Sequence, residues 1–297
     1  FRLMKSYVIK FKKLKEIIGL MNSADPLIST SARNAVKQIK SPRQVSQLNP
    51  LLLAASNAQD VTDIQDGMIA GVSSFSKEEQ RTRLVLEHMK RAPEDKKYLY
   101  YRILSGVGGN EAMSTVAGAF VPDNNATKKA VIDALAEWKE GEATTQIYQV
   151  LQQSAQGDFT KDAVDAFIKQ IRASDNTGDN KLIMLRNAME YAQNADQKNR
   201  ILSEVEKCKT FPALLYAGKF LDDPALQQKA ASAVMNIALG DKSIYGDNVK
   251  ALLEKTITVL KGSESEYQKE AIRKHIAALP QGTGFIPLFN GKDLTGW

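Results

Sequence analysis

The chain has 297 residues, enough for one large domain or two ordinary ones, and 43% of them are hydrophobic and 25% charged. This balance is that of a folded globular protein and excludes a chain that is disordered throughout. Aromatic residues make up only 7% of the chain, while alanine and leucine supply most of its apolar content. Such a composition favours closely packed helices over a β-sandwich.

The net charge of +6 comes from the amino-terminal end of the chain alone. Six basic residues precede the first acidic residue, Glu16, and the other 34 basic and 34 acidic residues cancel. A nucleic-acid-binding protein carries its basic face through the whole fold, so we expect no nucleic-acid partner. The single cysteine, Cys208, excludes an intrachain disulfide and a cysteine-based zinc site, and it fits both a cytoplasmic and a periplasmic protein.

The first predicted element is the basic amino-terminal segment, which has two interpretations. Its lysines project into water while an apolar face packs inward, or the helix lies on an anionic membrane surface. We favour the first, in which the inward residues are Leu3, Tyr7, Val8, Phe11 and Leu14. Lysines interrupt every apolar run before a signal peptide could form, and no stretch reaches the roughly 18 apolar residues of a membrane span. Membrane contact is therefore not expected.

The next elements follow the periodicity of α-helices. Residues 32–39, "ARNAVKQI", look like a degraded copy of a helix that recurs later, and residues 78–92 predict an amphipathic helix. In residues 60–67 three acids occur at three-residue steps and predict an acidic helix face: Asp60, Asp63 and Asp66. Residues 106–112, "GVGGNEA", resemble a phosphate-binding loop. Because they follow a helix and lack a closing Lys-Ser/Thr, we interpret them as a helix end and a turn.

One helix repeats through the rest of the chain. Residues 127–138 and 160–171 start 33 positions apart, and both place Ala-Val at their fourth and fifth positions, before apolar residues at steps of three and four. Weaker copies cover residues 95–106, 197–208, 227–238 and 268–279. A second set of amphipathic segments lies between the copies, at 142–155, 180–193, 211–221 and 248–261. Each unit is therefore helix, turn, helix.

Short turns rich in Asp, Asn, Gly and Pro separate these helices. They stand at residues 123–125, 157–158, 175–179 and 222–224, and Gly240 marks a further helix end. Asx side chains cap helix N-termini, and links this short make neighbouring helices antiparallel. We therefore expect an all-α fold over residues 1–281, an α-α superhelix of antiparallel helix pairs that resembles HEAT and armadillo repeats. A short extended segment would follow it.

The helical part of the sequence offers few groups for catalysis. His88 and His275 are its only histidines, 187 positions apart, and neither belongs to a His-Glu-x-x-His motif. Residues 175–181, "DNTGDNK", cluster oxygen ligands but lack the glycine and closing glutamate of a calcium loop, so we expect a solvated turn. Asn125 begins a glycosylation sequon, a pattern that is common by chance. We predict no catalytic residue, cofactor-binding residue or metal ligand in this chain.

The last fourteen residues, "GFIPLFNGKDLTGW" at 284–297, differ from the helices. Their apolar residues alternate as in a strand, and Asn290-Gly291 suits a tight turn. The segment resembles the opening of the bacterial 3-keto-disaccharide hydrolase domain family, which typically reads Gly-Phe-x-x-Leu-Phe-Asn-Gly-Lys-Asp-Leu-Thr-Gly-Trp. The matching residues are Gly284, Phe285, Leu288, Phe289, Asn290, Gly291, Lys292, Asp293, Leu294, Thr295, Gly296 and Trp297.

This resemblance implies that residues 282–297 are a linker and the truncated start of a jelly-roll-like β-sandwich acting on modified sugars. Members of the family are often fused to helical repeats, and their location is secreted or periplasmic. The catalytic residues would follow Trp297. The chain begins with Phe1 and ends inside this pattern, so we expect a piece of a longer polypeptide.

Together these features predict a non-catalytic helical-repeat scaffold within a larger sugar-processing hydrolase. Its concave face would bind a protein partner or a glycan, or the helices would hold the downstream β-sandwich. Two alternatives stay open. The superhelix has a ligand-binding or catalytic groove of its own, formed by His88 or His275 with nearby carboxylates, or the chain is an adaptor unrelated to sugars.

Overall fold

The fold is that of a computed structural model, which describes residues 11–38, 41–120, 124–154 and 157–282. Within these residues the chain forms sixteen α-helices and two 3₁₀-helices, and it contains no strand. The predicted all-α fold of helix pairs is therefore confirmed. Residues 284–297 and the predicted inward residues Leu3, Tyr7 and Val8 lie outside the described part of the chain, whereas Leu14 is buried as expected.

The chain divides into two compact units, Phe1–Ala173 and Ser174–Trp297. The helices of the first, unit 1, are α1 (Phe11–Leu20), α2 (Pro26–Val36), α3 (Pro42–Ala54), α4 (Ala58–Val72), α5 (Glu78–Arg91), η2 (Glu94–Tyr100), α6 (Tyr101–Val107), α7 (Asn110–Gly118), α8 (Asn125–Ala136), η3 (Lys139–Gly141), α9 (Thr144–Gln153) and α10 (Thr160–Ala173). Those of the second, unit 2, are α11 (Gly178–Tyr191), α12 (Ala195–Cys208), α13 (Phe211–Gly218), α14 (Gln227–Gly240), α15 (Asp247–Val259) and α16 (Ser265–Ala278).

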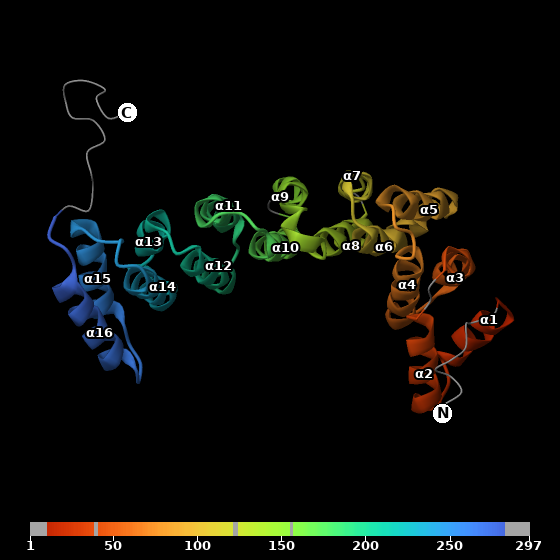
Figure 1. The fold of residues 1–297 in the computed structure, drawn as a ribbon, viewed down its shortest axis with the longest axis horizontal. Coiled ribbons are helices and arrows are strands. Elements are labelled where there is room, and N and C mark those ends of the chain that lie inside the picture. Colours follow the sequence, from red (N-terminus) through yellow and green to blue (C-terminus); the bar gives the residue numbers. More distant parts are fainter. Residues whose placement is uncertain (1–10, 39–40, 121–123, 155–156, 283–297) are drawn as a thin grey trace, which may run out of the picture. The chain divides into compact units, whose positions relative to one another are not determined.

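Unit 1 is built from five helix pairs, in which each odd-numbered helix packs against the even-numbered helix that follows it. The helices α2, α4, α6, α8 and α10 also contact one another in series, and we call them the even-numbered layer. In Figure 1, α7 and α9 lie on one side of α8 and α10, in agreement with the contacts of α7 with α9. Successive pairs thus stack layer on layer, as repeat proteins do.

Unit 2 follows the same rule with three helix pairs. Its even-numbered helices α12, α14 and α16 contact one another in series, and α11 contacts α13. The core of α14 consists mostly of small side chains: Ala230, Ala231, Ala233, Val234 and Ala238 are all fully buried. Small residues let neighbouring helix backbones approach closely while still excluding water.

The repeated sequence maps onto one kind of helix in both units. The best copies, residues 127–138 and 160–171, cover α8 and α10, and the weaker copies fall on η2–α6, α12, α14 and α16. The second set of predicted helices coincides with α9, α11, α13 and α15. Each repeat therefore ends in an even-numbered helix, which confirms the predicted helix, turn, helix unit.

The turn residues act at the helix ends as their chemistry predicts. The side chains of Asn124 and Thr177 accept hydrogen bonds from the backbone N–H groups of the first turns of α8 and α11. Thr177 lies in the "DNTGDNK" segment, which is a capping turn. Gly108, with φ of 82°, follows α6, so residues 106–112 form the predicted helix end and turn.

A buried glutamine ties the fourth and fifth helix pairs together. Gln170 of α10 is fully buried, and its Nε2 donates hydrogen bonds to the carbonyls of Ala136 (3.1 Å) and Trp138 (2.9 Å). Its Oε1 accepts a bond of 3.1 Å from the N–H of Ala143. One side chain thus satisfies three main-chain groups of the irregular link between α8 and α9.

Candidate functional site

A groove of about 660 Å³ lies on the even-numbered layer of unit 1, between α4, η2, α6 and α8. Val61 and Ile69 of α4 form one apolar side, and Leu99 of η2 lies next to them. The opposite side comes from α8 and includes Asp133 and Glu137. The volume falls within the range of about 300–1,000 Å³ that is usual for ligand sites.

The floor of the groove depends on close packing between α4 and α6. A Cβ at Gly106 would lie 2.7 Å from the side chain of Ile69, so a larger residue at this position would require Ile69 to shift. Gln65, which is buried beside the floor, donates a 2.7 Å hydrogen bond to the carbonyl of Leu99 and fixes η2 against α4. The groove is therefore a preformed part of the repeat stack.

Each charged side chain that lines the groove lies near a side chain of opposite charge. Glu137 Oε1 lies 2.5 Å from Lys169 Nζ, and Asp133 Oδ1 lies 2.5 Å from the Nζ of Lys129 on the same helix. Arg102 Nη1 lies 2.7 Å from Asp66 Oδ1 of α4. The formal charges of these three pairs cancel, so the groove has no bias towards a strongly anionic or cationic ligand.

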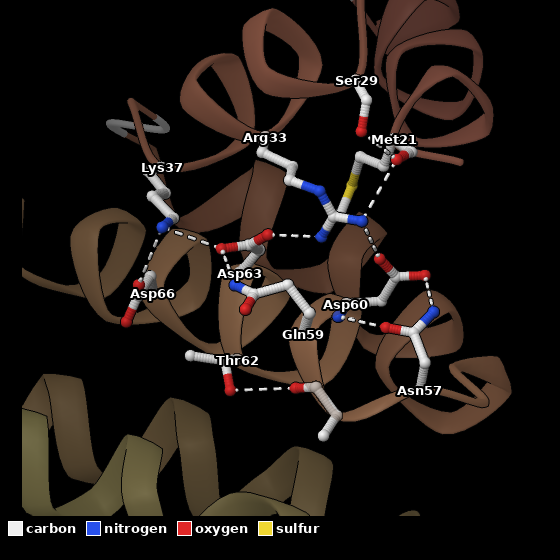
Figure 2. A network of polar contacts seen from close by, with 11 residues as sticks. Met21, Ser29, Arg33, Lys37, Asn57, Gln59, Asp60, Thr62, Asp63 and Asp66 are labelled. Atoms are coloured by element: carbon white, nitrogen blue, oxygen red, sulfur yellow. Dashed lines mark hydrogen bonds and ion pairs between the residues drawn. The ribbon is translucent and has the colours of Figure 1, made fainter. Parts of the chain in front are cut away.

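A network of ion pairs around the buried Asp63 joins α2 to α4 (Figure 2). Arg33 Nη1 lies 2.6 Å from Asp63 Oδ2, and Arg33 Nη2 lies 2.9 Å from Asp60 Oδ1. Lys37 Nζ lies 2.8 Å from Asp63 Oδ1 and 3.6 Å from Asp66 Oδ2. The Asp63 side chain has no exposure to water, so the two cations replace its hydration.

Hydrogen bonds from neutral groups complete this network. Arg33 Nη2 also donates to the carbonyl of Met21 at 3.1 Å, and the hydroxyl of Ser29 donates to the same carbonyl at 2.6 Å. Gln59 Nε2 donates to Asp63 Oδ1 at 3.1 Å. The carbonyl of Met21 follows α1, so the network holds the end of α1 as well as α2.

Burial alone would raise the pKa of Asp63, but hydrogen bonds from Lys37 and Arg33 outweigh it and leave the pKa of Asp63 below its ordinary value. The hydrogen bond to Asp63 is also the main reason why the pKa values of Arg33 and Lys37 are raised. These three groups are therefore charged at neutral pH.

The network continues into the groove through Asp66, which contacts both Lys37 and Arg102. Six side chains of alternating sign thus follow one another from α2 and α4 to α6, and we call them the ion chain: Asp60, Arg33, Asp63, Lys37, Asp66 and Arg102. The predicted acidic face of residues 60–67 exists on α4. However, basic side chains of α2 and α6 cover it.

The two histidines lie in different units, and neither lines the groove. His88 of α5 has its Nε2 3.2 Å from the Oγ of Ser46 on α3, and burial, followed by the charge of Arg91, lowers its pKa. Burial, followed by the charge of Lys242, lowers the pKa of His275 on α16. Among the described residues, no carboxylate forms an ion pair with either ring.

The segment that resembled a phosphate loop already holds a carboxylate of the chain itself. A Cβ at Gly109, before the first turn of α7, would lie 2.0 Å from Oε1 of Glu78. The Glu78 carboxylate therefore lies beside Gly109, the residue that precedes α7. The Cys208 thiol is buried and donates a hydrogen bond of 3.5 Å to the carbonyl of Glu204. Burial raises the pKa of this thiol to about 11.

Within the part of the chain that the structure describes, no group of three or more His, Cys, Asp or Glu side chains is arranged to hold a metal ion. Each helix in that part is too short or too polar to cross a lipid bilayer. One sequence pattern agrees with the ion chain, although it does not identify the partners. Arg33 and Lys37 are four residues apart, and the acids on α4 recur every three residues, which is the complementary spacing of two facing helices.

No known protein family matches the sequence, and no curated protein matches it. Among solved structures, the chain is similar to a crystal structure of an engineered protein, with 16% identity, 90% of this chain and 97% of that chain covered, and a TM-score of 0.28. A structure from the computational design of self-assembling cyclic homo-oligomers shares 11% identity over 90% of each chain, with a TM-score of 0.14. Neither similarity is close enough to carry an argument on function.

Proposed function

We propose that this chain is a non-catalytic helical-repeat scaffold, the interaction segment of a larger sugar-processing hydrolase. The observation that carries the proposal is the groove on the even-numbered layer, which is preformed, of ligand size and electrically balanced. Its two carboxylates, Asp133 and Glu137, are exposed and paired with lysines, an arrangement that suits binding better than proton transfer. The sugar-processing context, with a bacterial periplasmic or secreted location, rests on the resemblance of residues 284–297.

A protein partner fits the groove better than a glycan. The apolar sides formed by Val61, Ile69 and Leu99 gain most from apolar side chains of a partner. The cancelling charges at the rim add selectivity without a net field. A downstream β-sandwich is the first protein to test as the partner, because it would belong to the same polypeptide.

Turnover of 3-keto-glycosides tests the scaffold role. We expect the chain on its own to release no product, and a polypeptide that continues through the β-sandwich to be active. Hydrolysis by residues 1–297 alone would disprove the non-catalytic role. Inactivity of the longer polypeptide on every 3-keto-glycoside would leave an adaptor unrelated to sugars as the better description.

A bulky substitution in the groove tests its role in binding. Ala130 lines the groove, whereas Ala126 is exposed on the same helix and does not. Ala130→Arg should weaken binding of the separately produced β-sandwich domain at least tenfold in calorimetry, and Ala126→Arg should leave it unchanged. Equal affinities for both variants would exclude the groove as the contact surface, and groove-dependent binding of soluble glycans instead would identify a glycan as its ligand.

The contact between Ser46 and His88 supports a second candidate, a catalytic site within the helices themselves. The distance of 3.2 Å between Ser46 Oγ and His88 Nε2 is close to the hydrogen-bond distance at which a histidine base activates a serine nucleophile. Ser46→Ala and His88→Gln test it in the longer polypeptide. Loss of turnover in both variants, with unchanged helical content, would favour this candidate over the scaffold.

A further inference from the structure

The first helix pair of unit 1, α1 and α2, buries few apolar side chains of its own. Those that the structure describes as buried are Leu14, Met21, Ala32 and Val36. Three large apolar residues at the end of α1 and the start of α2 are instead exposed: Leu20 by 44%, Leu27 by 67% and Ile28 by 42%. Among the side chains whose burial the structure describes, this pair therefore buries less apolar surface than α3 and α4 do.

The side of α2 that faces α4 combines charged side chains with the buried Val36. It carries Arg33 and Lys37, which bind Asp60, Asp63 and Asp66 in the ion chain. Four contacts between charged side chains thus cross this boundary, and in Figure 2 they form a continuous line between the two helices. The carbonyl of Met21 adds the end of α1 to the same set of contacts.

Glycine brings the two helices close enough for these ion pairs. A Cβ at Gly67 of α4 would lie 2.7 Å from the carbonyl oxygen of Val36 and 3.0 Å from its Cγ1. The boundary thus combines one tight backbone contact with buried charges. A buried carboxylate that loses its cations is strongly destabilising, because nothing else compensates for its lost hydration.

The next boundary, between α3 and α4, is apolar. Its two helices bury Val45, Leu48, Leu52, Ile64, Met68 and Val72, each exposed by 2% or less. Local opening follows the weakest boundary. Among the described helices, α1 and α2 contact the rest of unit 1 mainly through the boundary between α2 and α4.

We propose that α1 and α2 form a releasable helix pair, which opens as a unit while the other helices of unit 1 stay folded, and that the ion chain controls this opening. Opening would separate the cations of α2 from the carboxylates of α4 and give all of them access to water. The inference is independent of the proposed scaffold role.

Hydrogen–deuterium exchange of the whole chain, read by mass spectrometry at neutral pH, tests this proposal. In Asp63→Asn we expect exchange in residues 14–36 to become at least tenfold faster, with helices α5 to α10 unchanged. The matched control is Asp133→Asn, which removes an exposed carboxylate of α8 (58% exposed) and should alter exchange in residues 14–36 less than twofold. No acceleration in Asp63→Asn, or equal acceleration throughout unit 1, would overturn the proposal.

Two further variants keep the test decisive if Asp63→Asn does not fold. Lys37→Met removes one cation whose side chain is already 40% exposed, so we expect a smaller acceleration in the same residues alone. The double variant Arg33→Met with Asp63→Leu replaces a buried pair by apolar groups, which proteins often tolerate. It should exchange no faster than the unsubstituted chain. Rapid exchange of the double variant outside residues 14–36 would contradict control by the ion chain.

Discussion

Two contacts between even-numbered helices, α2 with α4 and α12 with α14, have the same place in the repeat and opposite chemistry. The first depends on Arg33 and Lys37 against buried acids of α4. The second depends on apolar residues, with Leu202 of α12 and Val234 of α14 fully buried. Glu206 of α12 adds partly exposed polar contacts to α14, with Lys229 at 3.3 Å and Asn236 at 2.7 Å.

This difference shows that one repeat architecture accepts two kinds of boundary. Apolar packing supplies stability that changes little with pH or salt, because it depends on area removed from water. A chain of paired charges fixes which residues face one another but gives less net stability, since each charge loses its hydration. The four predictions below separate these two contributions, from the largest expected effect to the smallest.

The largest effect should come from the apolar boundary. Leu202→Ala leaves a cavity in unit 2, and we expect the free energy of unfolding to fall by about 3 kcal/mol. Urea denaturation followed by circular dichroism measures it. Ile183→Ala on α11 is the control, because its side chain is 56% exposed, and we expect it to cost less than about 1 kcal/mol. A comparable loss in both variants would mean that burial does not distinguish them.

Glycine substitutions should have opposite signs at two helical sites of unit 1. Gly67→Ala places its Cβ against Val36 and should cost about 1–3 kcal/mol. Gly19→Ala in α1 meets no atom within 4 Å and should gain about 0.5–1 kcal/mol from its helix propensity. The same denaturation measurement compares them. Stabilisation by Gly67→Ala would show that α2 and α4 are not packed as closely as the structure indicates.

Acid should weaken the charged boundary and spare the apolar one. Folding lowers the pKa of Asp63. Its contribution to the free energy of unfolding is therefore complete above its unfolded pKa of about 3.9 and is lost as the pH falls through its folded pKa. The groups that face Asp63 are Arg33, Lys37 and Gln59, of which both cations stay charged in acid. The unsubstituted chain should therefore lose more stability between pH 5 and pH 2 than Asp63→Asn. Identical losses of stability in the two proteins would show that the charge of Asp63 does not stabilise the fold.

The smallest effect should come from the peripheral polar contact of the apolar boundary. Glu206 lies near Lys229 and accepts a 2.7 Å hydrogen bond from Asn236, but both ion-pair partners are partly exposed. We expect Glu206→Gln to change the free energy of unfolding by less than about 1 kcal/mol. A larger loss in urea denaturation would mean that the α12–α14 boundary also depends on charge.

The sequence predicts the repeat well because periodicity records which side of each helix is buried. Residues 127–138 and 160–171 keep the same pattern and become equivalent helices, α8 and α10. Helix α7, by contrast, lies in a short segment after Gly108 and Gly109, and the periodicity did not predict it as a separate helix. Pro50 interrupts the pattern of α3, which nevertheless continues through it.

The ion chain and the groove could not be predicted in the same way. Pairing Arg33 with Asp63 requires contact between helices 30 residues apart, and the spacing of charges within one helix does not select that partner. The groove needs α4, η2, α6 and α8 together, so no single segment contains its signal. Sequence periodicity identifies buried faces, whereas a surface site depends on how several helices are placed.

Gln170 restricts the number of residues that can connect α8 to α9. Its amide can bond the carbonyls of Ala136 and Trp138 and the N–H of Ala143 together only while these three groups keep their present spacing. An inserted residue in this link would leave a buried donor or acceptor without its partner. Tags, cleavage sites and grafted loops should therefore be placed in other turns of the protein, and related sequences that keep this glutamine should also keep the number of residues in the link.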